Sequence, residues 1–119
     1  MTINKLRMAK AGLSRRRFRL GSLLPKLSKV RTGTTIRFTL PEASRVKLSF
    51  ARKRGRRFRA AGSFSVRAHA GLNKLRFQGR LSRHKVLKPG RYRVTLRATD
   101  QFGNRSQSPK LGFTLLPRG

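Results

Sequence analysis

The sequence predicts an all-β protein, an antiparallel β-sandwich of about seven strands. Apolar residues recur at every second position in several segments, which is the pattern of strands with one buried face. Turn-forming Gly, Pro, Asn and Asp residues separate these segments, mostly at intervals of about ten residues. No helical pattern of useful length lies between them, so a parallel sheet with crossover helices is excluded.

Five segments show the alternation clearly, and two show it weakly. The clear segments are 33–41, 45–52, 75–79, 90–100 and 110–117, and the weaker ones are 18–23 and 58–66. In each segment one set of side chains is expected to face the core, while Arg, Lys, Ser and Thr face the solvent. The expected inward residues are Ile36, Phe38, Leu40, Val46, Leu48, Phe50, Leu75, Phe77, Tyr92, Val94, Leu96, Ala98, Leu111, Phe113 and Leu115.

Residues 1–17 are expected to form a basic tail outside the fold, which leaves the sandwich at 18–117. A few apolar residues in the tail could share one face of a short helix, but Gly12 and the arginine run 15–17 weaken such a helix. A disordered tail is therefore the prediction. The tail has no continuous apolar stretch of the kind found in signal peptides. No segment approaches the roughly 20 apolar residues of a membrane span.

The charge of the chain is extreme. There are 32 Lys and Arg residues against two acidic residues, Glu42 and Asp100, which gives a net charge of +30. Such a chain attracts polyanions, among them nucleic acid, anionic cell-wall polymer and anionic lipid. The excess of Arg over Lys suits bidentate phosphate recognition, and a GC-rich coding bias is the other explanation. Cysteine is absent, which excludes disulfides and thiolate metal sites.

The most basic stretch is 51–62, ARKRGRRFRAAG, which is either an arm that grips a nucleic-acid backbone or the turn of a β-hairpin. A three-residue loop, 53–55, would put Gly55 at the left-handed position of the turn and Phe50 opposite Phe58. A two-residue loop would instead turn Phe58 to the solvent. The three-residue hairpin is therefore predicted. Its tip is a candidate polyanion contact, or a solvated turn that discourages edge pairing, and consists of Lys53, Arg54, Arg56 and Arg57.

No catalytic, cofactor or metal site is predicted, and the chain is expected not to be an enzyme. Glu42 and Asp100 fall on different turns, and nothing in the sequence suggests that the two carboxylates converge. His69 and His84 lack metal-ligand spacing. The sequence has no phosphate-binding loop, dinucleotide fingerprint or nucleophile elbow.

The segment 87–106, LKPGRYRVTLRATDQFGNRS, resembles the sixth strand of immunoglobulin-like folds and the loop after it. A Pro-Gly turn precedes Tyr92, and the phrase 98–104, ATDQFGN, is similar to the one that closes this strand in bacterial immunoglobulin-like and fibronectin-type-III-like modules. The segment 33–50 resembles the second and third strands of the same modules. Together the resemblance covers about 18–117.

The resemblance implies an immunoglobulin-like sandwich in which the Tyr92 hydroxyl bonds back to the backbone just upstream. It also implies a spacer, stalk or wall-contacting unit at the cell surface. Independently, Asp100 at the start of a turn is expected to accept hydrogen bonds from backbone N–H groups two residues on. Phe102 and Arg105 in the same loop are further candidate contact residues.

Two functions follow. The first is a non-catalytic adhesive or spacer module that contacts anionic cell-wall polymer, which favours an extracellular location. The alternative is a small intracellular nucleic-acid-binding protein, ribosomal or DNA-compacting, that acts through its arginines. Non-specific nucleic-acid binding in vitro is expected under both, because it follows from the charge alone.

Overall fold

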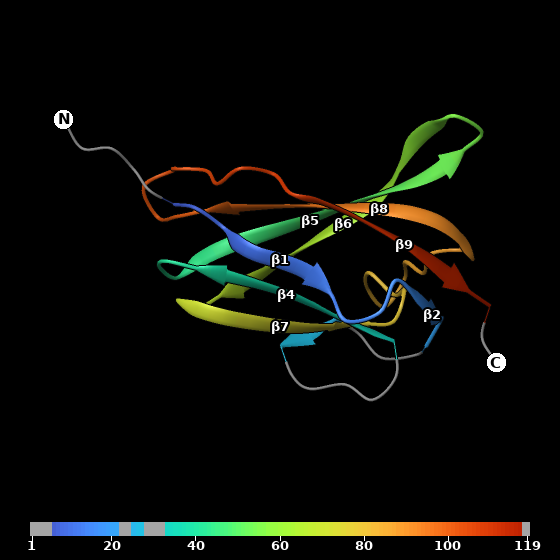
Figure 1. The fold of residues 1–119 in the computed structure, drawn as a ribbon, viewed down its shortest axis with the longest axis horizontal. Coiled ribbons are helices and arrows are strands. Elements are labelled where there is room, and N and C mark those ends of the chain that lie inside the picture. Colours follow the sequence, from blue (N-terminus) through green and yellow to red (C-terminus); the bar gives the residue numbers. More distant parts are fainter. Residues whose placement is uncertain (1–5, 22–24, 28–32, 118–119) are drawn as a thin grey trace.

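The computed structural model describes residues 6–21, 25–27 and 33–117, and these residues form two β-sheets with the core between them (Figure 1). No helix occurs in these three ranges. The predicted all-β class with two packed sheets is therefore confirmed. The described residues form more strands than the seven or so predicted, because short strands flank the expected set near the N-terminus.

The four-stranded sheet has the order β1-β4-β7-β3. Its strands are β1 (Ala9–Leu13), β4 (Thr34–Leu40), β7 (Gly71–Phe77) and β3 (Lys26–Leu27). The five-stranded sheet has the order β2-β9-β8-β5-β6. Its strands are β2 (Arg17–Arg19), β9 (Lys110–Leu116), β8 (Gly90–Thr99), β5 (Ser44–Arg54) and β6 (Arg57–Ala68). All neighbouring strands are antiparallel except β2 and β9, which are parallel.

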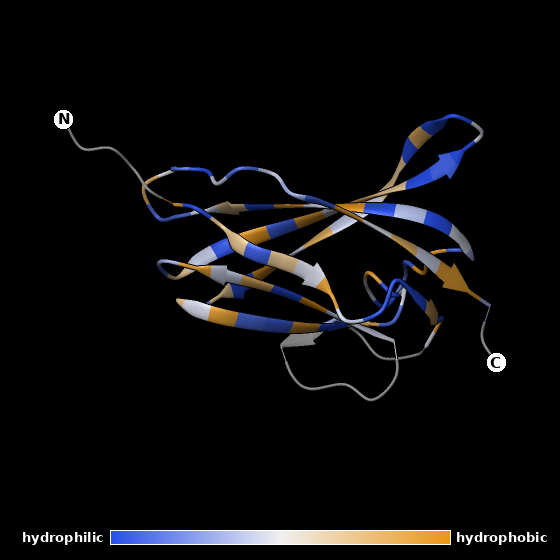
Figure 2. Ribbon diagram, viewed as in Figure 1, coloured by the Kyte–Doolittle hydropathy of each residue, from blue (hydrophilic) through white to orange (hydrophobic). Residues whose placement is uncertain are grey.

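The core consists of the side chains that the alternation predicts to face inward. Polar and apolar residues alternate along the long strands of both sheets (Figure 2). Every predicted inward residue is buried, apart from the half-buried Leu111 at the margin of the core and Phe58 of the hairpin, which is 37% exposed. Aromatic rings join the two sheets: Phe50 stacks on Phe77 with ring centroids 4.8 Å apart. Offset or edge contacts of this kind stabilise beyond the apolar area they bury.

The N-terminal segment is not a tail, and the prediction of disorder is wrong for residues 6–17. β1 pairs with β4, and Leu6 and Met8 are buried in the core. The Met8 backbone N–H donates to Gln107 Oε1 at 3.1 Å, and Gln107 Nε2 donates back to the Met8 carbonyl. Only 36% of the residues are hydrophobic, so burial of these two side chains adds substantially to a small core. The sandwich thus begins before residue 18; residues 1–5 lie outside the described residues.

The hairpin between β5 and β6 exists, but its predicted register is wrong. Arg54 pairs with Arg57, so the loop is residues 55–56, with Gly55 at φ 65° in the first loop position. This is the glycine placement of a type II′ turn. Further along, a bulge shifts the register so that Phe50 pairs with Gly62. The bulge therefore brings Phe64, not Phe58, into the inward phase, where it stacks on Phe50 at 5.7 Å.

The turns before and after β8 have the hydrogen bonds expected of them. The Tyr92 hydroxyl donates to the Lys88 carbonyl oxygen at 2.5 Å. Asp100 Oδ1 accepts from the backbone N–H of Phe102 at 2.9 Å and from that of Asn104 at 2.9 Å. Asp100 Oδ2 accepts from Asn104 Nδ2 at 3.0 Å. Both ends of β8 are thus fixed by side-chain contacts to local backbone.

Candidate polyanion-binding face

The outer surface of the five-stranded sheet, turned away from the core, is lined with cations. Because side chains alternate along a strand, the residues next to each buried position project outward. Each strand of this sheet contributes at least one Lys or Arg to the outward set. We call this surface the basic face; its cations are Arg17, Arg19, Arg45, Lys47, Lys53, Arg67, Arg91, Arg93, Arg97 and Lys110.

The strand register arranges these cations in rows across the sheet. One row runs Arg67, Arg45, Thr99, because Arg45 pairs with both of the others. The next runs Ser65, Lys47, Arg97 in the same way. Consecutive rows are about 7 Å apart along the strands. The face therefore repeats positive charge and hydroxyl groups at regular intervals in two directions.

No strand of this sheet contains an acidic residue. Between the cations, the outward residues are mostly Ser, Thr, Ala and Gly, with Phe58 and Leu116 as the apolar exceptions. Adjacent cations repel one another, and nearby counter-ions reduce that repulsion. An extended anion with several charges would neutralise many of these groups at once.

The four basic residues of the hairpin tip are together and exposed, as the hairpin prediction requires. Beside the tip, the Arg93 guanidinium lies 4.2 Å from the centroid of the Phe58 ring, and Phe58 is 37% exposed. The prediction that Phe58 faces the core is wrong, because the two-residue turn pairs it with the outward-facing Lys53. Phe58 is instead part of the surface beside the basic face.

Phe102 and Arg105 are also exposed, but their loop follows Thr99, which pairs with Arg45 at the end of β5 away from the hairpin tip. Figure 1 shows the loop after β8 at the opposite end of the sheet from the β5–β6 hairpin. Phe102 is the most exposed large apolar side chain described, at 76%. β5 runs about 30 Å between Arg45 and Arg54, at about 3.4 Å per residue. The predicted contact residues therefore form two separate clusters. The basic face connects them, and the sequence alone did not show it, since it depends on cross-strand register.

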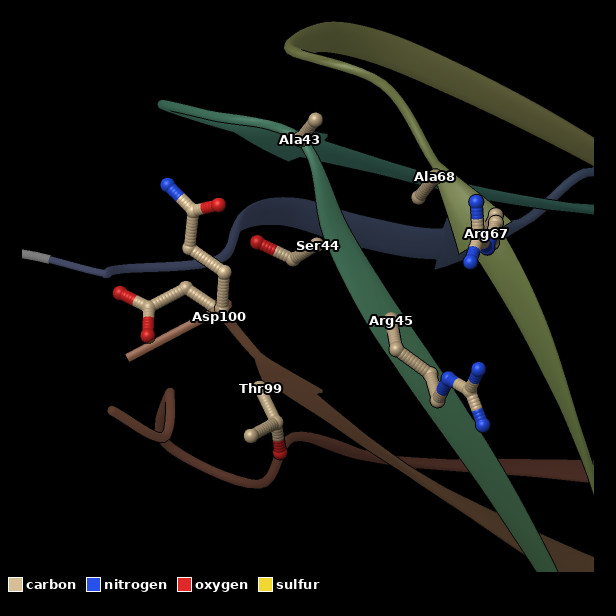
Figure 3. Close-up of a pocket in the computed structure, with 8 residues that line it drawn as sticks. Ala43, Ser44, Arg45, Arg67, Ala68, Thr99 and Asp100 are labelled. Atoms are coloured by element: carbon tan, nitrogen blue, oxygen red, sulfur yellow. The ribbon is translucent and has the colours of Figure 1, made fainter. Parts of the chain in front are cut away.

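An open depression of about 580 Å³ lies at the Asp100 end of the sheet. Its lining comes from the start of β5, the end of β6, and the end of β8 with the loop that follows. In Figure 3 the Arg45 and Arg67 side chains lie on one side of the depression and Asp100 on the other. This depression is where the basic face meets the turn that Asp100 organises.

The two acidic residues converge, contrary to the sequence-based expectation. A hydrogen bond with Asp100 raises the pKa of Glu42, as do partial desolvation and the charge of Asp100. Burial alone would raise the pKa of Asp100, but hydrogen bonds from Asn104, Glu42 and the Phe102 backbone outweigh burial and lower it. The loop after β4 and the loop after β8 therefore meet at this end of the sandwich.

This convergence does not resemble a glycosidase site. Glycosidase carboxyl groups stand about 5–9.5 Å apart and must face a sugar and a water, whereas Glu42 and Asp100 lie close enough for each carboxyl group to shift the pKa of the other. Both Asp100 oxygens also accept hydrogen bonds within their own turn. Asp100 is thus engaged in closing its own turn.

Among the described residues, no three His, Cys, Asp or Glu side chains group together as metal ligands would. His69 Nδ1 lies 2.8 Å from the Ala70 carbonyl oxygen, and both histidines are exposed. Within the same ranges, no helix has the length and apolar character that crossing a bilayer requires.

A scan against models of known protein families and a search of curated protein sequences find no match to this chain.

Proposed function

We propose that this chain is a non-catalytic, immunoglobulin-like module that binds an anionic polymer of the cell surface through its basic face. The observation that carries the proposal is the face itself: cations from all five strands in rows, with no acidic residue in any of those strands. The resemblance of segments 33–50 and 87–106 to modules of exported bacterial proteins supports cell-wall polymer as the ligand and the cell surface as the location.

The strand order supports the immunoglobulin-like part of the proposal. Immunoglobulin sandwiches place strands A, B and E in one sheet and G, F and C in the other. Here β1, β4 and β7 are neighbours in one sheet, and β9, β8 and β5 in the other. If β8 is strand F, Tyr92 stands where the tyrosine corner belongs. The short strands β2 and β3 are additions to this pattern at the sheet edges.

Binding on this face is electrostatic and depends little on ligand sequence. A polymer laid across the rows would contact Arg and Lys directly, while Ser and Thr hydroxyls between them bond to its oxygens. Each neutralised anionic group releases a counter-ion, so affinity should fall steeply with salt. A rigid sheet also positions the guanidinium groups before binding, which lowers the entropy cost.

A nucleic-acid-binding protein is the second candidate, and the Phe58–Arg93 pair favours it. Proteins that bind single strands combine cationic surfaces with aromatic rings on which bases stack. Phe58 is half-exposed beside the basic face, and its ring is already in contact with a guanidinium. This candidate requires that the protein prefer polymers with bases over polymers with phosphate alone.

The test compares two variants that each lose three positive charges. Arg45→Gln/Lys47→Gln/Arg97→Gln changes the basic face, and Arg54→Gln/Arg56→Gln/Arg57→Gln changes the hairpin tip outside that face. Affinity for poly(glycerol phosphate) is measured against salt concentration. We expect the face variant to reduce the slope of log affinity against log salt by about 2, as loss of three phosphate contacts implies, and the hairpin variant to reduce it less. Equal effects of the two variants would contradict the assignment of binding to the face.

The same titrations with oligo(dT) of equal charge separate the two candidates. The cell-surface proposal expects no preference for the oligonucleotide at about 0.15 M salt. A clear preference that disappears in Phe58→Ala would favour the nucleic-acid candidate instead, because only base stacking would depend on that ring.

A further inference from the structure

The depression at the end of the basic face has a chemistry of its own. It is lined by two arginines, Arg45 from β5 and Arg67 from β6, and by the Thr99 side chain at the end of β8. Both arginines are exposed, and Thr99 is half-buried. All three are accessible to a ligand that enters from the solvent.

The register places these side chains in one row. Arg45 is the direct partner of Arg67 on one side and of Thr99 on the other. Directly paired residues on one face have Cβ atoms about 4.5–5.5 Å apart. Two guanidinium groups thus start from neighbouring positions and project from the same side of the sheet, with a hydroxyl group beside them.

Asp100 follows Thr99 directly in the chain, but its carboxylate binds groups of its own turn and not the two arginines. Its two oxygens accept three hydrogen bonds from Phe102 and Asn104 within its own turn. In Figure 3 it lies across the depression from the arginines. Like charges directly opposite one another in a sheet are destabilising, so an anion between Arg45 and Arg67 would relieve a repulsion built into the fold.

The donors match one class of anion better than others. A phosphate monoester carries nearly two negative charges at neutral pH and three strong acceptor oxygens. Two guanidinium forks and one hydroxyl supply donors to all three. A phosphodiester has only two such oxygens and a single charge, and a carboxylate is planar with two.

We propose that Arg45, Arg67 and Thr99 form a binding site for a phosphate monoester. The site rests on the proposed function in one respect, since it would take the terminal phosphate of a polymer lying on the basic face. A small free phosphate compound presents the same chemistry, and the experiment distinguishes the two sources.

The experiment is an NMR titration of the full chain with methyl phosphate and, separately, with dimethyl phosphate, at constant ionic strength. Saturable shifts at residues 45, 67 and 99 are expected with methyl phosphate, at an affinity about tenfold or more above that for dimethyl phosphate. Arg67→Gln should weaken methyl phosphate binding about tenfold. Arg67→Lys keeps the charge but loses the fork, so it should recover only part of the affinity.

Arg56→Gln is the matched control, because it removes the same charge from the hairpin loop. It should change methyl phosphate affinity less than about twofold, since it acts only through screened long-range charge. Equal losses in Arg67→Gln and Arg56→Gln, equal affinity for the two esters, or shifts spread evenly over the basic face would each overturn the site.

The source is identified with poly(glycerol phosphate) before and after removal of its terminal phosphate. If removal weakens binding to the wild-type chain but not to Arg67→Gln, the site takes the polymer end; if removal has no effect while methyl phosphate still binds, the site takes a small phosphate compound. Failure of the methyl phosphate titration, with polymer binding still sensitive to the basic-face variant, would reject the site and leave the proposed function standing.

Discussion

The Tyr92 hydroxyl donates a 2.5 Å hydrogen bond to the Lys88 carbonyl oxygen, and this contact closes the turn that leads into β8. Tyr92 is only 3% exposed, and its ring stacks on Phe113 with centroids 5.5 Å apart. Burial raises the pKa of Tyr92 above its ordinary value, although Arg52 and the bond to Lys88 act in the opposite direction. The hydroxyl therefore remains protonated and able to donate at neutral pH.

Tyr92→Phe should lower the free energy of unfolding by about 1–1.5 kcal/mol, because the ring stays packed while the Lys88 carbonyl loses its partner. Chemical denaturation measures this loss. Phe102→Leu is a suitable control, since that side chain is 76% exposed and should change stability by no more than about 0.5 kcal/mol. An unaltered unfolding midpoint in Tyr92→Phe would mean that the hydrogen bond contributes nothing to stability.

The Glu42–Asp100 contact predicts an acid-sensitive stability. The pKa of Asp100 is lowered in the folded state, so its contribution is present above the ordinary value of 3.8 and is lost as pH falls through the lowered value. Asp100→Asn should therefore destabilise the protein at neutral pH, and its difference from the wild type should shrink in acid. Melting temperatures of both proteins, measured from neutral to acid pH, check this; a difference independent of pH would contradict it.

Glu42 should behave in the opposite sense. Its pKa is raised above the ordinary value of 4.5, so its contribution is present below that value and disappears as pH rises through the raised pKa. Glu42→Gln removes the like-charge contact and should leave neutral-pH stability unchanged or slightly higher. The same melting series tests this. A marked loss of stability at neutral pH would show that the ionised Glu42 stabilises the fold.

Which side chains face the core was predictable from the sequence because this property depends only on the period of two within a strand. Phe38, Phe77 and Phe113 each stand in an alternating run and are all buried. The N-terminal segment lacks such a run: Leu6 and Met8 are buried, but the β1 pairing is interrupted between Ala9 and Gly12. Because β1 is irregular, its apolar residues do not follow the period of two by which strands are recognised in a sequence.

The cross-strand relationships were not predictable, because each depends on one irregularity elsewhere. The bulge beside Phe50 shifts the register of the β5–β6 pair. Gly62 next to the bulge is a signal for it, since glycine inside a strand often marks a bulge, but one glycine does not fix which residue is left unpaired. That register decides that Arg45 stands opposite Arg67. The Glu42–Asp100 contact likewise depends on how two loops, far apart in the sequence, are brought together. The hairpin tip could be predicted as a site, whereas the basic face could not.

The corrected hairpin register predicts a large difference between two phenylalanines. Phe50 is 2% exposed and contacts the rings of Phe64, Phe77 and Phe113, so Phe50→Ala should cost about 3–5 kcal/mol. Phe58 is 37% exposed and contacts Arg93, so Phe58→Ala should cost about 0.5–1 kcal/mol. Urea denaturation of both variants measures the difference. Similar losses of unfolding free energy in the two variants would instead support the register with a three-residue loop, in which Phe50 and Phe58 face each other.

The glycines of the hairpin give a second test of its geometry. Gly55 has φ 65°, and a Cβ there would meet nothing within 4 Å, so Gly55→Ala should cost only the backbone strain of about 1–2 kcal/mol. Gly62 has φ 133°, and its Cβ would approach Leu81 Cδ1 to 2.6 Å. Gly62→Ala adds overpacking to strain and should cost at least about 1 kcal/mol more.

The comparison is made by denaturant unfolding of the two alanine variants, together with the double variant Gly62→Ala/Leu81→Ala. Removing the Leu81 side chain relieves the collision, so the cost of Gly62→Ala in that background should fall toward the cost of strain alone. If the two costs simply add in the double variant, Leu81 does not oppose a side chain at position 62, which contradicts the close packing of Leu81 on Gly62 beside the bulge. The single-residue shift that this bulge introduces between the turn and Arg67 pairs Arg67 with Arg45, on which the phosphate site depends.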